Sequence, residues 1–321
     1  MCKILNVNKP IIRAYLRHAF AISMLDKKAF DSGWIYDKYI QLEYNKENLE
    51  NPYINYVDYN FFANDGVFIK QHFLLSLTKD RNQIINFIHD IIDDNFYYFT
   101  QWNEMYIKDK AAYKNYDFPH ACMIYGYDEK FLYTMGYTTK NWKWTNHKVS
   151  NEEFVKAIMV SDWFPDNFWC DTFKGVEDFQ WRFSEENMLN ELRQYIFGRN
   201  NENNNVFYGL AGCKKFAKDI NKFSDDGFWI PRPSIYTIVE HKKMMINRIN
   251  YLINEKKMLE LNDMLFSYQK ILLDLQTVLL QALKYNISLK KELGKKIANN
   301  LFGVFMREEE VVNILYQKLV G

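Results

Sequence analysis

Apolar residues follow different periods in the two halves of the chain. Short runs of aromatic and β-branched residues predict strands at 51–59 and 95–102. Residues 120–139 alternate apolar and small positions around a two-residue turn, Glu129-Lys130, which predicts a β-hairpin. Residues 81–94 instead carry isoleucines at helical spacing. The N-terminal half is therefore predicted to mix helices and strands.

From residue 184 onward, apolar positions recur every three or four residues almost to the end of the chain. This spacing predicts helices at 184–198, 206–221, 235–258, 261–286, 288–302 and 305–319. The polar run 199–205 predicts a surface loop between the first two. We therefore expect an α+β domain over residues 1–183 and a helical domain over residues 184–321.

Local signals predict two helix starts. Pro10, preceded by Asn8 and Lys9, predicts a helix beginning near residue 10, because proline suits the first helical turn. Ser150, followed three residues later by Glu153, forms a capping-box pattern. Residues 34–43 fit a short strand or a helix equally well.

Composition narrows the class of protein. The 321 residues are 48% hydrophobic and 17% aromatic, enough for a sizeable core in one large or two ordinary domains. Forty-one basic residues balance 40 acidic ones without a long basic run, which argues against a nucleic-acid partner. No apolar run approaches the ~18 residues of a membrane span. Lys3, Lys9 and Arg13 interrupt the first apolar stretches, so no signal peptide is predicted.

The four cysteines, Cys2, Cys122, Cys170 and Cys213, show no CxxC spacing. This pattern favours a reducing, cytoplasmic location over a disulfide framework or a zinc site. No HExxH motif, metal-spaced carboxylate pair or Gly-rich phosphate loop is present, so neither a metal site nor a nucleotide site is predicted. Cys2 precedes the first helix by several residues, and Cys122 is expected to be buried, so neither is favoured as a nucleophile.

The candidate chemistry centres on His120, which enters the predicted hairpin directly after Pro119. Papain-like enzymes present their general base on such a hairpin to a cysteine on a distant helix. The run 118–128, the strand around Gly136-Tyr137, VFYGLAGCKKFAKDI and IVEHKKMMINRINYL together resemble the papain-like family of butirosin biosynthesis protein H.

The resemblance implies a papain-like catalytic domain in natural-product, nonribosomal-peptide or antibiotic biosynthesis. Its activity would be acyl transfer: an acyl or peptidyl group would move from a carrier-protein phosphopantetheine thioester to an amine, forming an amide. The implied partners are an acyl or peptidyl carrier protein and an amine acceptor. No cofactor would be bound permanently, because phosphopantetheine arrives on the carrier. The helical domain would be a lid or a carrier-docking surface.

The resemblance places the nucleophilic cysteine near the start of the first long helix, where the helix dipole lowers a thiol pKa. The matching residue here is Ala14, which cannot attack a thioester. A natural loss of the nucleophile, a deliberate Cys-to-Ala replacement or a different register would each explain it. Asn8, six residues upstream, matches the amide that papain-like enzymes use for the oxyanion, or it is simply a helix cap.

The third member of a triad would orient the His120 imidazole. Asp128 lies eight residues further along the strand, roughly 26 Å away at ~3.3 Å per residue, so it is better interpreted as a turn residue. With the predicted turn, paired positions sum to 259, which puts Thr139 opposite His120. Thr138 and Asn141 come close with a small register slip. Thr139 is therefore the candidate orienter, or an ordinary strand threonine.

Two further groups of residues have two interpretations each. Glu240, His241 and Lys242 lie with Arg248 on one predicted helix, either as a solvated face or as a contact for the carrier or its phosphate. Five tryptophans suit either an aromatic acyl pocket or core packing. They are Trp142, Trp144, Trp163, Trp169 and Trp181.

Two functions of different classes follow from these residues. The first is a Cys-His acyltransferase that forms amides but is inactive as the sequence stands, because position 14 is alanine. The second is a catalytically inactive papain-like protein that binds a pathway intermediate or a carrier protein. A cysteine protease is less favoured, because the resemblance is to biosynthetic members.

Overall fold

The computed structural model describes residues 2–47, 52–57, 66–76, 80–139, 143–159, 167–199 and 205–321. The chain forms two compact units. Unit 1 comprises Met1–Asp26 and Asn60–Phe179, and unit 2 comprises Lys27–Tyr59 and Gln180–Gly321. The fold mixes helices and strands and has a helical C-terminal region, as predicted. The change from unit 1 to unit 2 at 179/180 lies close to the predicted boundary, but residues 27–59, expected in the first domain, belong to unit 2.

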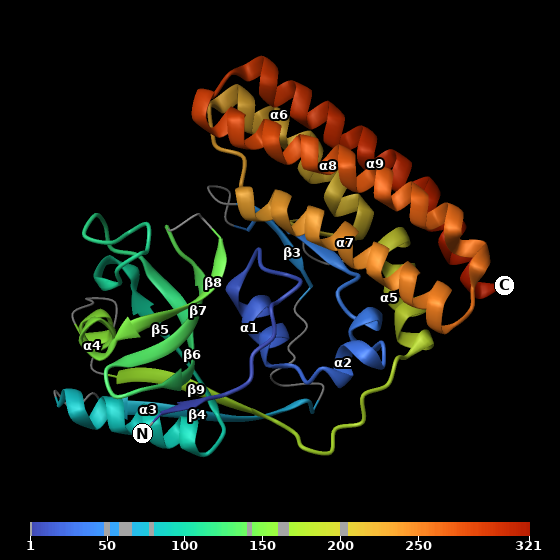
Figure 1. Cartoon of the computed structure of the whole chain (residues 1–321). Helices are drawn as coiled ribbons and strands as arrows, with labels where there is room; N and C mark the ends of the chain where they lie inside the picture. The colour runs from blue at the N-terminus through green and yellow to red at the C-terminus, as the bar shows by residue number, and fades with distance from the viewer. Residues whose placement is uncertain are drawn as a thin grey trace. The chain divides into compact units, whose positions relative to one another are not determined.

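Unit 1 is built on a seven-stranded sheet of order β4-β9-β5-β6-β7-β8, with β1 paired to β6 (Figure 1). Its strands are β1 (Lys3–Ile4), β4 (Phe68–Ser76), β5 (Tyr97–Asn103), β6 (Pro119–Tyr127), β7 (Phe131–Tyr137), β8 (Trp144–Ser150) and β9 (Asn167–Gly175). All the pairings are antiparallel. The predicted strand at 95–102 and the hairpin at 120–139 are confirmed as β5 and as β6–β7.

Helices cover both faces of this sheet. On one face, α3 (Arg81–Asp93) and α4 (Asn151–Met159) bury their apolar sides in a common core with β5, β6 and β7. On the other, α1 (Leu16–Met24) packs Phe20 against Phe99 and Trp144. The helix predicted at 81–94 is confirmed. So is the capping box, because the Glu153 amide donates to Ser150 Oγ while the Glu153 carboxylate accepts from the Ser150 amide.

The register of the β6–β7 hairpin changes along its length. Near the turn, Tyr127 pairs with Leu132 and Gly126 with Tyr133, as the predicted sum of 259 requires. A bulge at Tyr125 then shifts the pairing, so that Ile124 faces Thr134. Because the bulge adds one residue to β6, the pairing between β6 and β7 is shifted by one position on the side of Ile124. His120 lies on that side, so Thr139 is not opposite it. As predicted, Asp128 is a turn residue, because its carboxylate accepts from the amides of Lys130 and Phe131.

The first helix begins later than predicted. It starts at Leu16 rather than near Pro10. The reason lies at Asn8, whose backbone amide donates to the Ser23 carbonyl and whose side chain donates to the Leu25 carbonyl. Asn8 is thereby fixed beside the C-terminal end of α1. The residues after Asn8 must therefore run the length of the helix, back to its N-terminal end, before α1 can begin.

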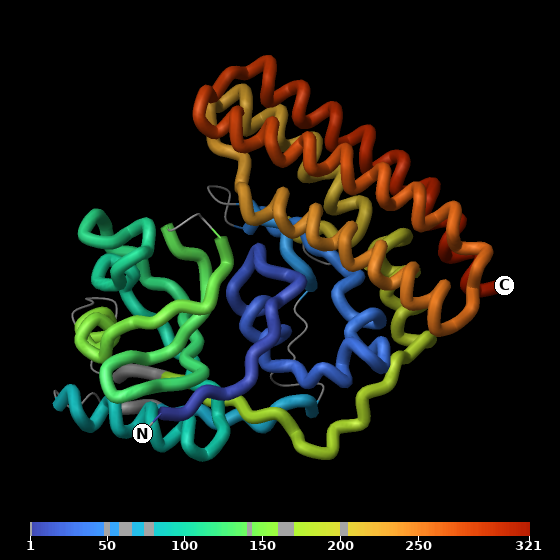
Figure 2. The backbone as a smooth tube through the Cα atoms, in the orientation of Figure 1, coloured from blue at the N-terminus to red at the C-terminus, as the bar shows by residue number. Residues whose placement is uncertain are grey.

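Unit 2 joins long helices to a small sheet of order β10-β2-β3. Its elements are α2 (Lys28–Asp31), η1 (Trp34–Asp37), β2 (Leu42–Asn45), β3 (Tyr53–Tyr56), α5 (Glu185–Phe197), β10 (Val206–Tyr208), α6 (Gly209–Asp226), α7 (Arg232–Glu255), η3 (Leu259–Leu261), α8 (Asn262–Ser288) and α9 (Lys291–Val320). Figure 2 shows α6, α8 and α9 running side by side. The sheet packs on α6 and α7, where Tyr44 meets Phe216 and the Ile54 amide donates to Ser234 Oγ.

The structure corrects two predicted helices and resolves an open segment. The segments 288–302 and 305–319, predicted as separate helices, lie mostly in the single helix α9, which begins at Lys291 and continues through residues 303 and 304. The segment predicted to be helical from residue 206 first forms strand β10 and then turns into α6 at Gly209. Only glycine suits this corner, because φ is +59° and a Cβ would meet the Tyr195 carbonyl oxygen. Residues 34–43 contain η1 and the start of β2.

The described tryptophans pack in separate places. Trp144 contacts Phe20 and Tyr137 in unit 1, whereas Trp181 contacts Trp34 in unit 2. Trp142, Trp163, the side chain of Trp169 and residues 200–204 of the predicted loop lie outside the described residues.

Among the helices that the structure describes, none has the length and apolar character needed to cross a membrane.

Candidate functional site

A small cavity in unit 1 gathers side chains from α1, β5, β6, β7 and the loop after β5. Its volume is about 100 Å³. Its lining residues are Leu16, Trp102, Glu104, Lys110, Ala111, His120, Ala121, Met135, Tyr137, Thr138 and Thr139. Most of this lining is apolar, and the side chains of Glu104, Lys110 and His120 add an acid and two bases. The cavity therefore combines the features expected of a reaction site: an enclosed apolar volume and a few convergent polar groups.

His120 is held by a carboxylate that the sequence did not point to. It pairs with Trp102 in the β5–β6 ladder, and its Nδ1 lies 3.0 Å from Glu104 Oε1. The His120 side chain is 39% exposed, whereas that of Glu104 is only 9% exposed. A carboxylate at Nδ1 favours the tautomer in which Nδ1 carries the proton and Nε2 is free to accept one. Glu104 therefore does for His120 what the third member of a catalytic triad does.

Glu104 is itself positioned by Asn103. Asn103 Oδ1 accepts from the backbone amides of Met105 and Phe118, and Asn103 Nδ2 donates to Asp117 Oδ1 at 2.6 Å. The Glu104 amide also donates to the Phe118 carbonyl. These bonds tie the end of β5 to the chain just before β6. They fix the two backbones from which Glu104 and His120 project.

Lys110 adds a buried positive charge to the cavity. Its Nζ donates to the Tyr137 carbonyl at 3.0 Å, lies 3.5 Å from Glu104 Oε1 and stands over the Trp102 ring. Burial lowers the Lys110 pKa, although the Glu104 charge opposes this. Burial would raise the Glu104 pKa, but the His120 hydrogen bond and the Lys110 charge hold it below its usual value. The carboxylate therefore stays ionised and can support a protonated imidazole.

Gly136 makes room for this lysine. Its φ is +154°, and a Cβ at this position would lie 3.3 Å from Lys110 Nζ. A larger residue would have to push the ammonium group away from the strand. The close approach of β7 backbone to Lys110 thus depends on glycine at this position.

Thr139 lines the cavity but does not orient His120. Its amide and its Oγ1 donate to the same acceptor, the Asp109 carbonyl, at 2.7 and 3.1 Å. The threonine thereby ties the segment after β7 to the loop that carries Lys110. The predicted pairing of Thr139 with His120 is wrong, because the bulge at Tyr125 displaces the register.

The structure brings the start of α1, but not Asn8, to this cavity. Leu16, the first residue of α1, lines the cavity, and Ala14 lies two residues before it. Ala14, the position matched to a nucleophile, is not among the lining residues itself. Asn8 bonds to the other end of α1, about 13 Å away for nine helical residues. It therefore neither caps the start of α1 nor reaches an oxyanion there.

None of the four cysteines lines the described cavity. Cys122 lies two residues beyond His120 but is buried in the core, where burial raises its thiol pKa. Burial likewise raises the pKa of Cys170 and of Cys213 to about 12. Cys2 is exposed. Buried thiols of raised pKa are poor nucleophiles, as expected for packing cysteines.

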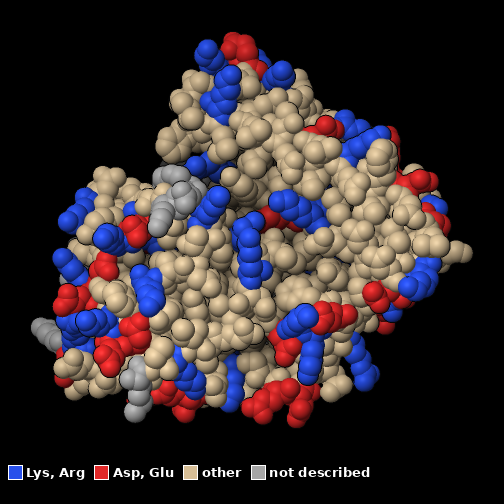
Figure 3. Space-filling model, viewed as in Figure 1, with Lys and Arg blue, Asp and Glu red and all other residues tan. Residues whose placement is uncertain are grey.

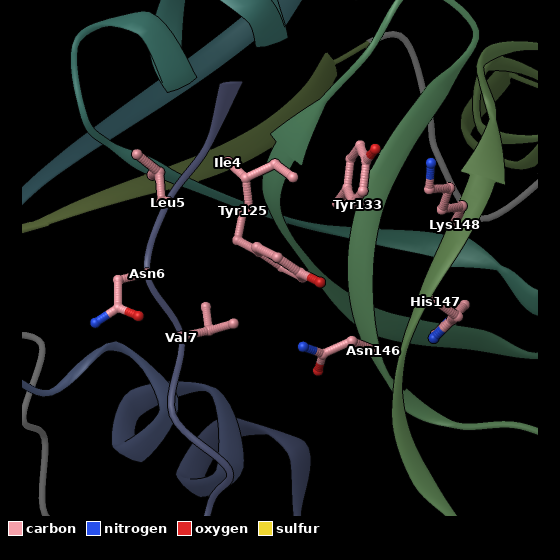
Figure 4. Close-up of a pocket in the computed structure, with 9 residues that line it drawn as sticks. All are labelled: Ile4, Leu5, Asn6, Val7, Tyr125, Tyr133, Asn146, His147 and Lys148. Carbon is pink, nitrogen blue, oxygen red and sulfur yellow. The ribbon is translucent and has the colours of Figure 1, made fainter. Parts of the chain in front are cut away.

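A larger groove of about 560 Å³ lies elsewhere on unit 1 (Figure 4). The segment from Ile4 to Val7 forms one wall, Tyr125 lies in the middle, and Tyr133, Asn146 and Lys148 come from β7 and β8. The Tyr133 hydroxyl and Lys148 both bond to Asp128. The Tyr133 hydroxyl and the Lys148 ammonium group, two of the polar groups in this groove, are therefore already bonded to Asp128. The smaller cavity, with its base and carboxylate in contact, is the better candidate for chemistry.

The buried group on α7 corrects a second expectation. Glu240, His241, Lys242 and Arg248 were expected to form a solvated face or a carrier contact, but all four are buried. Lys242 donates to Glu308, to the Tyr195 hydroxyl and to His241 Nδ1, and His241 Nε2 donates to the Ile40 carbonyl.

In the ranges that the structure describes, no group of three or more His, Cys, Asp or Glu residues is arranged to hold a metal ion.

The comparisons with known proteins add no family to this geometry. No model of a known protein family matches the chain, and no curated protein is similar enough to count as a relative.

Proposed function

We propose that unit 1 carries a papain-like acyl-transfer site, built to move an acyl or peptidyl group from a carrier-protein thioester to an amine. The observation that carries this proposal is the His120–Glu104 pair, which lines a cavity that also receives the first residue of α1. Acyl transfer needs a base beside the nucleophile and a group that orients the base. His120 and Glu104 fill the last two roles, and position 14 is the place of the first.

With cysteine at position 14, each step follows from these groups. His120 Nε2 takes the thiol proton, and the sulfur attacks the thioester carbonyl. The pantetheine thiolate leaves and takes the proton from His120, while Glu104 stabilises the transient imidazolium. An amine then attacks the acyl-cysteine, His120 accepts the amine proton, and the thiolate leaves as the amide forms. The Lys110 ammonium supplies positive charge near the developing oxyanion in place of Asn8.

With Ala14, the covalent step cannot occur. The same cavity then serves the second candidate function, a cytoplasmic binding protein for a pathway intermediate or a loaded carrier. The observation in its favour is the alanine itself, because the cavity and the His120–Glu104 pair are present without a nucleophile at position 14.

Intact-protein mass spectrometry separates the two functions. The probes are acetyl-pantetheine, whose acyl group suits a cavity of about 100 Å³, and carrier protein loaded with the same acyl group. All variants carry Cys2→Ser, because an exposed thiol exchanges with thioesters unaided. We expect an acyl adduct on Ala14→Cys, little on Ala14→Cys/His120→Ala and none on the protein with Ala14.

Each outcome decides between the functions. An adduct that depends on His120 supports the acyl-transfer site. No adduct on Ala14→Cys, together with saturable binding of the loaded carrier to the protein with Ala14, supports the binding protein instead. An adduct of equal rate with and without His120 would contradict the proposed base.

A further inference from the structure

Lys110 is a buried lysine that lines the unit 1 cavity. Its side chain is 7% exposed, and it shares the cavity with Glu104, His120 and a mostly apolar lining. Burial lowers the Lys110 pKa, because an apolar surrounding penalises the ammonium form more than the amine. The Glu104 charge acts in the opposite direction. A lysine desolvated beside a cavity is the kind of nucleophile that attacks carbonyl carbons.

The acceptors around the Lys110 amino group suit an uncharged amine. The structure describes two of them, the Tyr137 carbonyl at 3.0 Å and Glu104 Oε1 at 3.5 Å. An amine has two N–H groups for these acceptors and keeps a lone pair, whereas an ammonium has three N–H groups and no lone pair. The two described acceptors can therefore hold the amine form in place while its lone pair stays available.

The buried lysine of unit 2 shows the opposite arrangement. Lys242 is fully buried, and three acceptors surround its Nζ, one for each N–H of an ammonium. They are Glu308, the Tyr195 hydroxyl and His241 Nδ1. Lys242 is thus held as a cation, whereas Lys110 combines burial with a cavity.

We propose that Lys110 captures small, uncharged aldehydes or ketones in this cavity as a Schiff base. The capture needs no nucleophile at position 14, so it goes beyond the proposed acyl transfer and does not depend on it. The cavity volume of about 100 Å³ sets the size of the carbonyl compound. Since a water molecule occupies about 30 Å³ and benzene needs a cavity of about 150 Å³, roughly three heavy atoms fit, as in acetaldehyde. The Glu104 charge disfavours a carbonyl compound that carries its own carboxylate.

The groups that line the cavity balance each step of the capture. The Lys110 lone pair forms a bond to the carbonyl carbon, and the carbonyl oxygen takes a proton from the amine. The C–O bond then breaks, and the hydroxyl leaves as water with a proton from the His120 imidazolium. The product is a protonated imine, whose positive charge replaces that of the ammonium beside Glu104. Because His120 Nδ1 lies 3.0 Å from the same Glu104 oxygen, one carboxylate supports both the proton donor and the product.

Reductive labelling of the native chain with acetaldehyde and cyanoborohydride tests the proposal. Cyanoborohydride delivers hydride to the imine carbon and leaves a stable N-ethyl group on the lysine. Figure 3 shows lysine and arginine side chains spread over the displayed surface, so many amines compete for the aldehyde. The aldehyde is therefore kept limiting, and peptide mapping by mass spectrometry measures the rate at each lysine.

Lys108, exposed and two residues from Lys110, is the internal control. We expect Lys110 to be ethylated about tenfold faster or more, since each unit by which a lysine pKa is lowered raises its amine fraction tenfold. In the chain unfolded with guanidinium chloride, the two lysines should react at equal rates. Equal rates in the folded native chain would overturn the proposal.

A variant that fills the cavity tests whether the cavity is the place of reaction. Ala121→Leu keeps Lys110 but adds a larger side chain to the lining, so it should abolish the preference for Lys110 over Lys108. Ala211→Leu, at an exposed position of α6, is the matched control and should leave the preference unchanged. Unaltered far-ultraviolet circular dichroism would show that both variants fold.

Two other aldehydes make the same test without a variant. Benzaldehyde exceeds the cavity, and glyoxylate carries a carboxylate, so neither should label Lys110 in preference to Lys108. A preference that survives in folded Ala121→Leu overturns the proposal, because the reactive amine would then lie outside the cavity. An equal preference with benzaldehyde or glyoxylate overturns it as well, because the site would then not select small, uncharged carbonyl compounds.

Discussion

Both units place a lysine, a glutamate and a histidine in contact, but the two groups differ in how exposed the histidine is and in whether a cavity lies beside it. In unit 2, Lys242 and Glu308 are fully buried, and His241 is buried with them. In unit 1, Lys110 and Glu104 are nearly as buried, but His120 is 39% exposed and lines a cavity. The residue types are the same, so residue type alone does not distinguish the proposed site from the buried core.

The hydrogen bonds explain the difference further. Both nitrogens of His241 are occupied, Nε2 donating to the Ile40 carbonyl and Nδ1 accepting from Lys242. The rings of Tyr195 and Tyr56 stack on it. His120 has its carboxylate at Nδ1 and stands beside the cavity. A histidine whose two nitrogens are committed can only support structure, whereas one held at a single nitrogen can exchange a proton.

The largest expected effect tests the unit 1 group. In the Cys2→Ser/Ala14→Cys background, Glu104→Gln should lower the rate of acylation by acetyl-pantetheine by about 10²–10⁴-fold. Glutamine removes the charge that supports the imidazolium and no longer imposes the productive tautomer. A mass-spectrometric time course measures the rate, and Glu129→Gln in the exposed hairpin turn is the matched control. An unchanged rate would remove Glu104 from the site.

The second prediction contrasts the two lysines. Lys242→Met should lower the free energy of unfolding by about 3–5 kcal/mol, because it leaves the Glu308 carboxylate buried without its counterion. Lys110→Met should cost about 1–3 kcal/mol, because Glu104 keeps its bond to His120. Denaturant titration followed by circular dichroism measures both. Lys242→Met/Glu308→Leu should regain most of the loss, and equal costs for the two lysines would contradict the contrast.

A pH titration sharpens the comparison from the unit 2 side. Burial, and then the Lys242 charge, hold the His241 pKa well below its usual 6.5. The unfolded chain therefore binds a proton below pH 6.5 that the folded chain refuses. The contribution of His241 to the free energy of unfolding is complete above this pH and should fall by about 1.4 kcal/mol per pH unit below it. Denaturant midpoints across this range should show a shallower fall for His241→Gln than for the native protein.

Much of the fold of unit 1 could be predicted because local patterns decide it. The β5 strand, the hairpin turn, the α3 periodicity and the capping box at Ser150 each depend on residues close together in the sequence. The assignment of residues 27–59 to unit 2 could not be predicted. It depends on β2 pairing with β10, whose residues lie more than 150 positions further along.

The candidate site was predicted in part for the same reason. His120 followed from its own hairpin. Its partner Glu104 lies just beyond the end of β5, the strand that precedes the hairpin, because β5 ends where Asn103 pairs with Pro119. The only sign of Glu104 in the sequence was an acidic residue directly after a buried strand. The bulge at Tyr125 has no such sign in the sequence, and it shifts the position expected opposite His120.

The smallest expected effect concerns Thr139, which the hairpin pattern predicts opposite His120. Thr139→Val removes the Oγ1 bond to the Asp109 carbonyl and leaves the backbone bond to the same oxygen, so it should lower stability by only about 0.5–1 kcal/mol. In the Cys2→Ser/Ala14→Cys background it should not change the acylation rate, because Glu104 orients the His120 imidazole. Thr139→Ser keeps the hydroxyl and serves as the control for both measurements. If Thr139→Val slowed acylation as much as Glu104→Gln, the threonine would be an orienter after all. The His120–Glu104 contact would then be a structural contact, like those of the buried group in unit 2.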